Sequence, residues 1–222
     1  MSTNGNPDTS FSAQRVAMVE SQLRNRGILD PRVLQAMSKV PRHLFVAPER
    51  WPEAYADHPV PIGEHQTTSQ PYIIAAMLQA AEIKPQDRVL EIGAGSGYQT
   101  ALLSELAAQV FAIERYPQLV EGARHVLEQL GYRSATVVAA DGSLGLSEHA
   151  PYDAIVVAAA APRVPPALVE QLAPGGRLVV PVGDAQGQVL HLARKQDGGA
   201  ITFSLLEGCR FVPLIGQQGF AA

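Results

Sequence analysis

The segment from Val89 to Leu103, VLEIGAGSGYQTALL, constrains the fold more than any other part of this chain. A short apolar run leads through an acidic residue to three glycines at alternate positions, and a helical pattern follows them. Glycine permits positive φ in a tight turn and removes the Cβ atoms that would keep a ligand off the backbone. This strand–turn–helix context is typical of nucleotide sites. The spacing Gly93-x-Gly95-x-Gly97 differs, however, from the G-x-G-x-x-G of dinucleotide-binding folds.

From residue 88 onward, predicted strands and helices alternate. Apolar runs of strand length are found at 88–93, 110–114, 136–141, 152–160 and 176–183. Helical patterns separate them at 98–108, 117–130 and 166–172. Strands that are apolar throughout favour a parallel sheet covered on both faces. Two further runs, 189–195 and 201–206, flank the turn QDGG and predict a hairpin. We therefore expect an α/β fold with a doubly wound, mostly parallel Rossmann-like sheet, an N-terminal helical extension and a C-terminal β-hairpin.

The N-terminal extension is expected to consist of helices and one irregular segment. Apolar residues recur at helical spacing over 13–26, and Gly27 follows as a stop. Asp30-Pro31 predicts an N-cap followed by a proline at the first helical position, in a helix that ends before residue 41. Residues 41–68 show no clear period and are expected to be irregular, packed on the core. A third helix is predicted over about 69–81.

Length and composition favour one domain. A chain of 222 residues, 46% of them hydrophobic, can bury the core of a single α/β domain. We expect that domain to span 1–222. Its predicted parts are a disordered start (1–12), a helical lead-in (13–81), a cofactor-binding core (82–183) and C-terminal strands (184–222).

Charge and segment composition limit the partners and the compartment. A net charge of −4 argues against an electrostatic nucleic-acid binder. No apolar run approaches the ~18 residues that span a bilayer, and MSTNGNPDTS lacks the apolar core of a signal peptide. The one cysteine, Cys209, excludes an intramolecular disulfide. We therefore expect a cytoplasmic protein without nucleic-acid or membrane partners.

Acidic residues stand at the ends of three predicted strands. In an open α/β sheet the ligand binds beyond the carboxyl ends of the strands, where Glu91, Glu114 and Asp141 are expected. Glu114 can accept the hydrogen bonds of a ribose diol, or it can be a solvated residue at a strand end. Asp141 can accept from an adenine amino group, or it can be a residue of the turn Asp141-Gly142-Ser143. Glu91 is expected to face a cationic amino group, or to be an acid favoured by a helix N-terminus.

The sign of these charges selects the cofactor. A pyrophosphate binds at a helix N-terminus, often with a basic residue nearby, yet nothing basic lies between Val89 and Ala108. Three acidic residues instead match a ligand that carries a positive sulfur and an ammonium group. We therefore predict S-adenosyl-L-methionine as the cofactor, with S-adenosyl-L-homocysteine as its product.

Residue types that are missing at three places narrow the possible classes of methyl acceptor. The loop AAAAPRVP at 158–165 carries no acid, amide or hydroxyl to hold the amino group of a base. Cys209 lies in a strand-like run, where a small core residue is a simpler interpretation than a nucleophile. The six histidines show no metal-ligand spacing, so no metal is expected. A carboxylate, with a pKa near ~4, is already ionised at neutral pH and needs only to be aligned.

Five ordered blocks resemble one enzyme family. PVPIGEHQTTSQPYIIA at 59–75 resembles the signature of protein-L-isoaspartate (D-aspartate) O-methyltransferases, usually seen as PIG-x-GQTISQP. VPRHLFV precedes it, and the glycine segment, YDAIVVAAAAPRVPPALVEQLAPGGRLVVPVG and RFVPLIG follow, so that the resemblance covers about residues 13–216. It implies a monomeric repair enzyme that methylates the free α-carboxylate of L-isoaspartyl residues in damaged proteins and peptides. The ester then closes to a succinimide without further help.

The resemblance also implies the site residues. The family's active-site serine matches Ser69, which would orient the substrate carboxylate and would not act as a nucleophile. From the residues alone, a helix N-cap is an equal alternative for Ser69. The implied cofactor-binding residues are Gln66, Thr67, Thr68, Glu91, Gly93, Gly95, Gly97, Glu114, Arg115, Asp141 and Gly142.

Three positions depart from the family pattern. His65 and Ala140 stand where the family usually has glycine, and Thr68 where it usually has isoleucine. His65 could add a pH-dependent charge at the pocket rim, or it could be a neutral variant that points to solvent. Two other functions stay open: methylation of a different carboxylate, and a cofactor-binding relative without activity. The intact glycine loop, Glu114, Asp141 and Ser69 argue against the latter.

Overall fold

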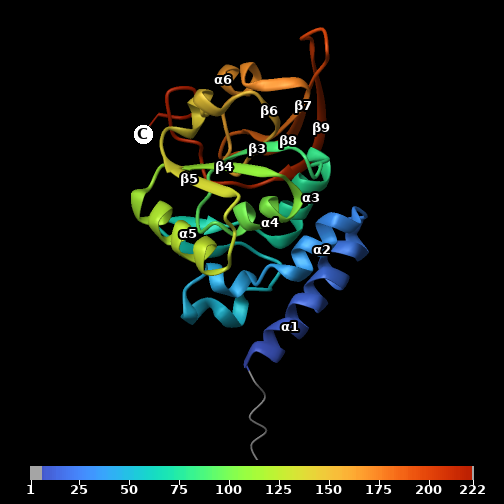
Figure 1. Ribbon diagram of the computed structural model, residues 1–222, viewed down its shortest axis with the longest axis vertical. Helices are drawn as coiled ribbons and strands as arrows, with labels where there is room; N and C mark the ends of the chain where they lie inside the picture. The colour runs from blue at the N-terminus through green and yellow to red at the C-terminus, as the bar shows by residue number, and fades with distance from the viewer. Residues whose placement is uncertain (1–6, 222) are drawn as a thin grey trace, which may run out of the picture.

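A seven-stranded sheet forms the centre of the molecule (Figure 1), in a computed structural model that describes residues 7–221. Its strands are β3 (Arg88–Ile92), β4 (Gln109–Glu114), β5 (Ala135–Ala139), β6 (Tyr152–Val157), β7 (Leu172–Gly183), β8 (Gln188–Lys195) and β9 (Ile201–Cys209). They lie in the order β5-β4-β3-β6-β7-β8-β9. The first five are parallel, and β8 and β9 add antiparallel pairs at one edge. The predicted fold class is confirmed.

Different helices cover the two faces of the sheet. α3 (Pro71–Ala81), α4 (Tyr98–Leu106) and α5 (Pro117–Gln129) lie on one face and α6 (Pro166–Glu170) on the other (Figure 1). Successive side chains of a strand point to opposite faces. In β3, Val89 joins the core on the α4 side, whereas Leu90 and Ile92 join the core on the α6 side. Because both faces are buried, the strands are apolar throughout.

The N-terminal helix begins earlier than predicted. α1 (Pro7–Met18) continues through a π-helical turn (Val19–Leu23) and a 3₁₀ turn (Arg24–Arg26), and it ends at Gly27 with φ +94°. The expected disorder of 1–12 is therefore wrong for residues 7–12, while residues 1–6 lie outside the described part. Phe11 supplies a physical reason, because its ring stacks on His43 with centroids 4.2 Å apart. That tertiary contact is invisible in a polar local sequence.

The second helix, α2 (Pro31–Lys39), begins as predicted. The Asp30 carboxylate accepts hydrogen bonds from the amides of Arg32 at 2.8 Å and Val33 at 3.4 Å, and Pro31 opens the helix. α2 packs against α3 and α4. The N-terminal helices therefore form an additional layer outside α3 and α4 (Figure 1).

Residues 41–68 contain more regular structure than expected. Two 3₁₀ turns, η3 (Arg42–Phe45) and η4 (Pro48–Glu53), precede a small antiparallel hairpin of β1 (Val60–Gly63) and β2 (Gln66–Thr68). Its two-residue turn, Glu64-His65, has φ of +50° and +55°, the signs of a type I′ turn. Such turns favour Asn-Gly, so Glu-His gives no hairpin signal, and the expectation of an irregular segment is wrong here.

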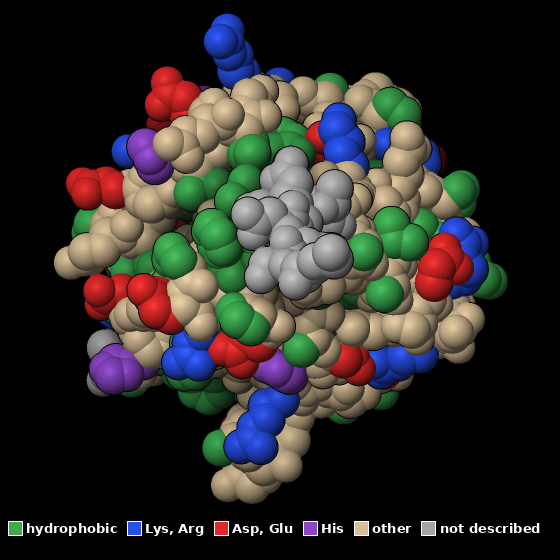
Figure 2. Space-filling model, turned by 90° about the horizontal axis from the view of Figure 1, so that it is seen from below, with side chains coloured by type: hydrophobic (Ala, Val, Ile, Leu, Met, Phe, Trp, Pro, Cys, Tyr) green, Lys and Arg blue, Asp and Glu red, His purple; other side chains and the backbone are tan. Residues whose placement is uncertain are grey.

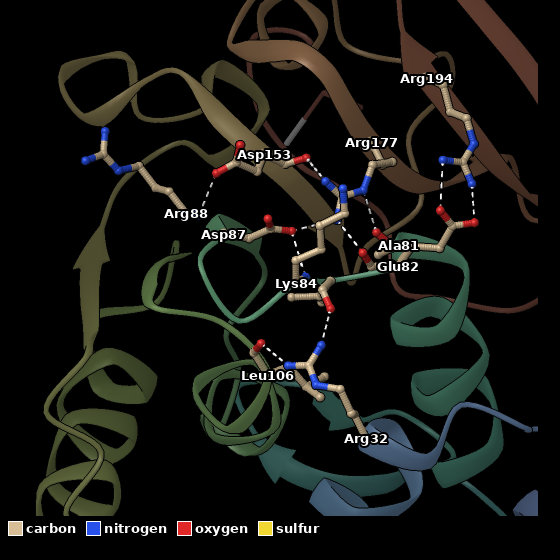
Figure 3. A network of polar contacts seen from close by, with 11 residues as sticks. Arg32, Ala81, Glu82, Lys84, Asp87, Arg88, Leu106, Asp153, Arg177 and Arg194 are labelled. Atoms are coloured by element: carbon tan, nitrogen blue, oxygen red, sulfur yellow. Dashed lines mark hydrogen bonds and ion pairs between the residues drawn. The ribbon is translucent and has the colours of Figure 1, made fainter.

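A buried polar network joins the amino ends of the strands (Figure 3). Arg177 donates to Asp87 Oδ2 at 2.6 Å and to the carbonyls of Ala81, Glu82 and Asp153. These contacts fasten the end of α3 to β6, β7 and the loop before β3. The carboxyl ends of the parallel strands lie on the opposite side of the molecule from this network.

Candidate active site

The glycine loop turns tightly between β3 and α4. Gly93, Gly95 and Gly97 have φ of +87°, +55° and +89°, a region that residues with a Cβ rarely adopt. The amides of Gly93 and Ala94 donate to the Ile113 carbonyl at 2.8 and 3.0 Å, which holds the loop against β4. The prediction that this turn needs glycine is confirmed.

A cavity of about 130 Å³ lies beyond the carboxyl ends of β3 and β4. It is called here the main cavity because of this position; larger and more open cavities lie elsewhere on the surface. The strand order reverses between β3 and β6, and open α/β sheets usually bind ligands at such a point. The walls come from the β1–β2 hairpin, the glycine loop, the end of β4, the turn η5 (Gly142–Leu144), the loop after β6 and the C-terminal segment. Lining residues include Gln66, Thr67, Gly93, Gly95, Glu114, Arg115, Gly142, Ala158, Ala159 and 212–215.

A smaller cavity of about 30 Å³, called here the serine cavity, adjoins the main cavity. Thr67, Gly93, Gly95 and Ala158 line both cavities, so the two share a wall. The serine cavity is further lined by Thr68, Ser69, Glu91 and Tyr98. The structure thus brings together most of the predicted site residues. Gly97 lies in neither cavity; it is the N-cap of α4, which begins at Tyr98.

Glu114 is held rigidly at the end of β4. Its Oε1 accepts hydrogen bonds from the amides of Arg115 at 2.7 Å and Tyr116 at 3.0 Å, and its Oε2 accepts from the amide of Gly95 at 3.0 Å. A carboxylate has about four acceptor positions, so one position on Oε2 is left for a ligand. In this geometry Glu114 can bind one ribose hydroxyl, rather than both hydroxyls of the diol.

Glu91 is fully buried at the end of β3. It accepts hydrogen bonds from the Thr100 hydroxyl at 2.5 Å and from Gln99 Nε2 at 3.1 Å, both on the first turn of α4. Burial raises the pKa of Glu91 to about 8 despite these two contacts. The carboxyl is therefore mostly protonated at neutral pH, and a cation in the adjoining cavity would favour its ionised form.

Asp141 lies just outside the main cavity, where it shapes a turn. Its side chain accepts from the Ser143 amide at 2.9 Å, the Ser143 hydroxyl at 2.7 Å and the Gln217 amide at 2.8 Å. Burial opposes ionisation, but these hydrogen bonds outweigh it and hold the pKa of Asp141 below its usual value. The turn interpretation thus describes the geometry, and Asp141 also anchors the C-terminal segment. Gly142 is the neighbour that reaches the main cavity.

Ser69 lies between the β1–β2 hairpin and α3. The N-cap of α3 is Gln70, and no side chain caps the helix, so the cap interpretation of Ser69 is wrong. Among the described residues, the Ser69 hydroxyl forms no hydrogen bond, whereas its carbonyl accepts from Arg42 Nη2 at 2.7 Å. Its hydroxyl is therefore available to a ligand in the serine cavity.

The C-terminal segment completes the main cavity. The Ala160 amide donates to the Val212 carbonyl at 2.8 Å, and the Leu214 amide donates to the Ala160 carbonyl at 2.7 Å. These bonds bring residues 212–215 beside the apolar loop after β6. The block RFVPLIG at 210–216 resembles the family, but nothing in the sequence indicates that it pairs with the loop after β6.

Comparison with known proteins identifies the family. The family model for protein-L-isoaspartate(D-aspartate) O-methyltransferase matches residues 13–219. The chain belongs to this family. It is 56% identical over 216 residues to the protein-L-isoaspartate O-methyltransferase of Koribacter versatilis, covering 97% of both chains. The enzyme of that name from Methanoculleus marisnigri is 54% identical, with 93% of this chain and 94% of the relative covered.

Two solved structures extend the likeness to the fold. A protein-L-isoaspartate O-methyltransferase superposes with a TM-score of 0.82 at 29% identity, over 92% of this chain and 67% of the other. A Plasmodium falciparum protein assigned to this family, in complex with S-adenosyl-L-homocysteine, superposes with a TM-score of 0.79 at 27% identity, over 90% and 98%. The family resemblance predicted from the motifs is confirmed.

The three departures from the family pattern lie in different places, and only Thr68 lines one of the two cavities. His65 is exposed at the hairpin tip and lines neither cavity, which agrees with a side chain that points to solvent. Thr68 is buried, and its hydroxyl accepts from Arg42 Nη1 at 3.1 Å. Ala140 lines a cavity next to Asp141. None of them obstructs the main cavity.

Proposed function

We propose that this chain uses S-adenosyl-L-methionine to methylate the free α-carboxylate of L-isoaspartyl residues in proteins and peptides. One observation supports this most: the main cavity, with its glycine loop and acidic strand end, shares a wall with the cavity of Ser69. A donor and an acceptor bound there would meet at Gly93 and Ala158.

The residues of the main cavity suit a cationic cofactor. When bound, S-adenosyl-L-methionine supplies a methyl group on a positively charged sulfur. Glu114 would hold one ribose hydroxyl, and Glu91, which lines the adjoining serine cavity, would face the ammonium group in its ionised form. Arg115, Gln66, Thr67 and Gly142 would line the rest of the pocket. Among the described residues, no group of three His, Cys, Asp or Glu is placed to hold a metal ion, and none is proposed.

The serine cavity suits a nucleophile that is already ionised. The Ser69 hydroxyl would donate a hydrogen bond to the substrate carboxylate and orient it toward the shared wall. The free carboxylate oxygen would attack the methyl carbon as the bond from that carbon to sulfur breaks, with no proton transfer. Proximity and orientation of this kind can supply ~7–11 kcal/mol. The loop at 158–161 consists of alanines and offers water no hydrogen-bonding side chain beside the reacting groups. The ester then loses methanol as the main chain closes to a succinimide.

The proposed partners are isoaspartyl-containing proteins and peptides, and the proposed state is a cytoplasmic monomer without nucleic-acid or membrane partners. Family resemblance and composition support these points. No helix of residues 7–221 is long and apolar enough to cross a membrane. On the face seen from below, acidic and basic side chains are interspersed toward the rim of the view, and hydrophobic side chains are more frequent nearer its middle (Figure 2).

Methyl transfer to a matched pair of peptides tests the proposed function. The purified protein is incubated with tritiated S-adenosyl-L-methionine and either an isoaspartyl peptide or the same peptide with normal aspartate. We expect base-labile label on the isoaspartyl peptide alone. Equal labelling of both peptides would mean a general carboxylate methyltransferase, and cofactor binding without labelling would mean a relative that does not catalyse this reaction.

A further inference from the structure

Two arginine side chains are buried among the described residues, and only one of them has an acidic partner. Arg42 is 0% exposed and Arg177 is 5% exposed. Arg177 forms an ion pair with Asp87 at 2.6 Å. No Asp or Glu in the described part of the chain forms an ion pair with Arg42. Because a buried charge without a counter-charge is strongly unfavourable, the position of Arg42 requires an explanation.

Neutral groups hold the Arg42 guanidinium in place. Its Nε donates to the Ala54 carbonyl at 2.7 Å, its Nη1 to Thr68 Oγ1 at 3.1 Å and its Nη2 to the Ser69 carbonyl at 2.7 Å. Its Cζ lies 4.7 Å from the centre of the Tyr98 ring. Burial lowers the pKa of Arg42, but a guanidinium remains protonated in proteins. These contacts fix the direction of the side chain without neutralising its charge.

The charge lies directly behind the serine cavity. Thr68, Ser69 and Tyr98 all contact Arg42, and all three line that cavity. The one acidic residue in the same wall is Glu91, which accepts hydrogen bonds from Thr100 and Gln99, forms no ion pair with Arg42, and would be balanced by the ammonium group of the bound cofactor. The positive field of Arg42 is therefore not cancelled by a neighbouring anion in the cavity wall.

We propose that Arg42 is a positioning residue for the substrate: from behind the Thr68–Ser69 backbone, its guanidinium attracts the isoaspartyl α-carboxylate into the serine cavity. This proposal rests on the proposed function, which supplies an anion at that place. The substrate carboxylate is then the counter-charge that the protein itself does not provide. In a buried site such an attraction is weakly screened, so it can act across one layer of backbone.

The intervening backbone has a chemical consequence. A direct bidentate salt bridge would place a charged donor on each carboxylate oxygen and make the one that has to attack the methyl carbon a weaker nucleophile. From behind the cavity wall, Arg42 stabilises the anion and leaves that oxygen to react. The carboxylate loses its charge as the ester forms, so Arg42 stabilises bound substrate more than the transition state. Its removal should therefore raise KM and leave kcat unchanged or slightly higher.

The proposal is tested by the preference for a charged over a neutral peptide. With S-adenosyl-L-homocysteine present, calorimetry measures the dissociation constants of an isoaspartyl peptide with a free α-carboxylate and of the same peptide with an α-carboxamide. We expect the wild-type chain to prefer the carboxylate by about tenfold or more. Arg42→Met should reduce that preference below about threefold, and Arg42→Lys should keep most of it. If Arg42→Met weakens both peptides equally, the role is structural and the proposal is wrong.

Charge can also be tested without removing Arg42. Thr68→Asp places a carboxylate against the guanidinium, while Thr68→Asn has the same shape without the charge. The Asp variant should lose the preference and the Asn variant should retain it; equal behaviour of the two would overturn the proposal even if Arg42→Met does not fold. Arg177→Lys is a buried-arginine control that should lower the free energy of unfolding and leave the preference for the carboxylate peptide unchanged.

The failure of the proposed function and the failure of this proposal give different results. If the wild-type chain methylates neither peptide, the proposed function fails. Normal methylation with an unchanged carboxylate preference in the Arg42 and Thr68 variants rejects only the role of Arg42.

Discussion

At the scale of single residues, the site combines groups that are already satisfied with groups that are available. Glu114 and Asp141 accept several hydrogen bonds within the protein. The Ser69 hydroxyl has no such partner among the described residues. A carboxylate that accepts several hydrogen bonds within the protein is a rigid part of the pocket, whereas a hydroxyl without such a bond can form one with the substrate. This difference predicts which substitutions change binding of the cofactor and which change transfer.

Ser69→Ala should impair methyl transfer and spare cofactor binding. A hydrogen bond to a charged group contributes ~1.5–3 kcal/mol, so kcat/KM for an isoaspartyl peptide should fall by about 10- to 100-fold. The affinity for S-adenosyl-L-homocysteine, measured by calorimetry, should stay within about twofold, because Ser69 does not line the main cavity. Ser69→Thr should recover part of the activity. Comparable losses of activity and cofactor affinity would show that Ser69 has a structural role.

Glu91→Gln should change the pH dependence of stability. The pKa of Glu91 is raised from 4.5 to about 8 in the folded chain, so folding favours its protonated form. This contribution is complete below pH 4.5 and is lost as the pH rises toward 8, at about 1.4 kcal/mol per unit. A glutamine mimics the protonated acid at every pH. Urea unfolding should therefore show the variant gaining stability relative to wild type between pH 5.5 and 8.5, and a constant difference would contradict the buried, protonated Glu91.

How much of the site could be predicted from the sequence depends on the range of the interaction. Gly93, Gly95 and Gly97 were predictable because a tight turn after a strand imposes a local requirement. The partners of Asp141 were not, since one of them, Gln217, lies 76 positions later in the chain. The burial of Arg42 was not predictable either: the block VPRHLFV resembles the family, but nothing in a short 3₁₀ turn shows that this guanidinium is buried behind Ser69.

At the scale of elements, local signals predicted the helices and strands of the central fold but not the β1–β2 hairpin. Apolar period and helix stops predict β3 to β9 because those signals lie within each element. The hairpin depends instead on pairing across a turn with an unfavourable sequence. A Cβ at Gly95 would lie 2.9 Å from Ile62 Cδ1, so the hairpin packs on the glycine loop. Its stability should therefore affect the shape of both cavities.

His65→Gly should stabilise the hairpin. His65 has φ +55°, which is unfavourable for residues with a Cβ, and glycine removes that penalty at a smaller entropic cost. We expect the free energy of unfolding to rise by about 0.5–1 kcal/mol in urea titration. His65→Ala, which keeps the Cβ, should bring no gain. Peptide KM should be unchanged in both variants, because His65 lines neither cavity; a lower stability of the glycine variant would show that the imidazole makes a contact worth more than the strain.

At the scale of the whole molecule, the amino ends and the carboxyl ends of the parallel strands differ in function. The amino ends carry the Arg177–Asp87 network, in which every buried charge has a partner. The carboxyl ends carry the cavities, and beside them Arg42 is buried with no acidic partner among residues 7–221. We infer that the stable network at the amino ends offsets the cost of burying Arg42 near the carboxyl ends, where only bound substrate would supply a counter-charge. Substitutions at the amino ends should therefore change the free energy of unfolding without changing the affinity for the cofactor product.

Asp87→Ala tests this separation. It leaves Arg177 buried without a counter-charge, so the free energy of unfolding should fall by about 3–5 kcal/mol in urea titration. Glu82→Ala, which breaks an exposed pair with Arg194, is the matched control and should cost no more than about 1 kcal/mol. Asp87→Ala combined with Arg177→Met should recover much of the loss, because the unpaired charge is then removed. Below the unfolding transition, S-adenosyl-L-homocysteine affinity should be unchanged in all three variants, and a large loss would mean that the network also shapes the main cavity across the full width of the sheet.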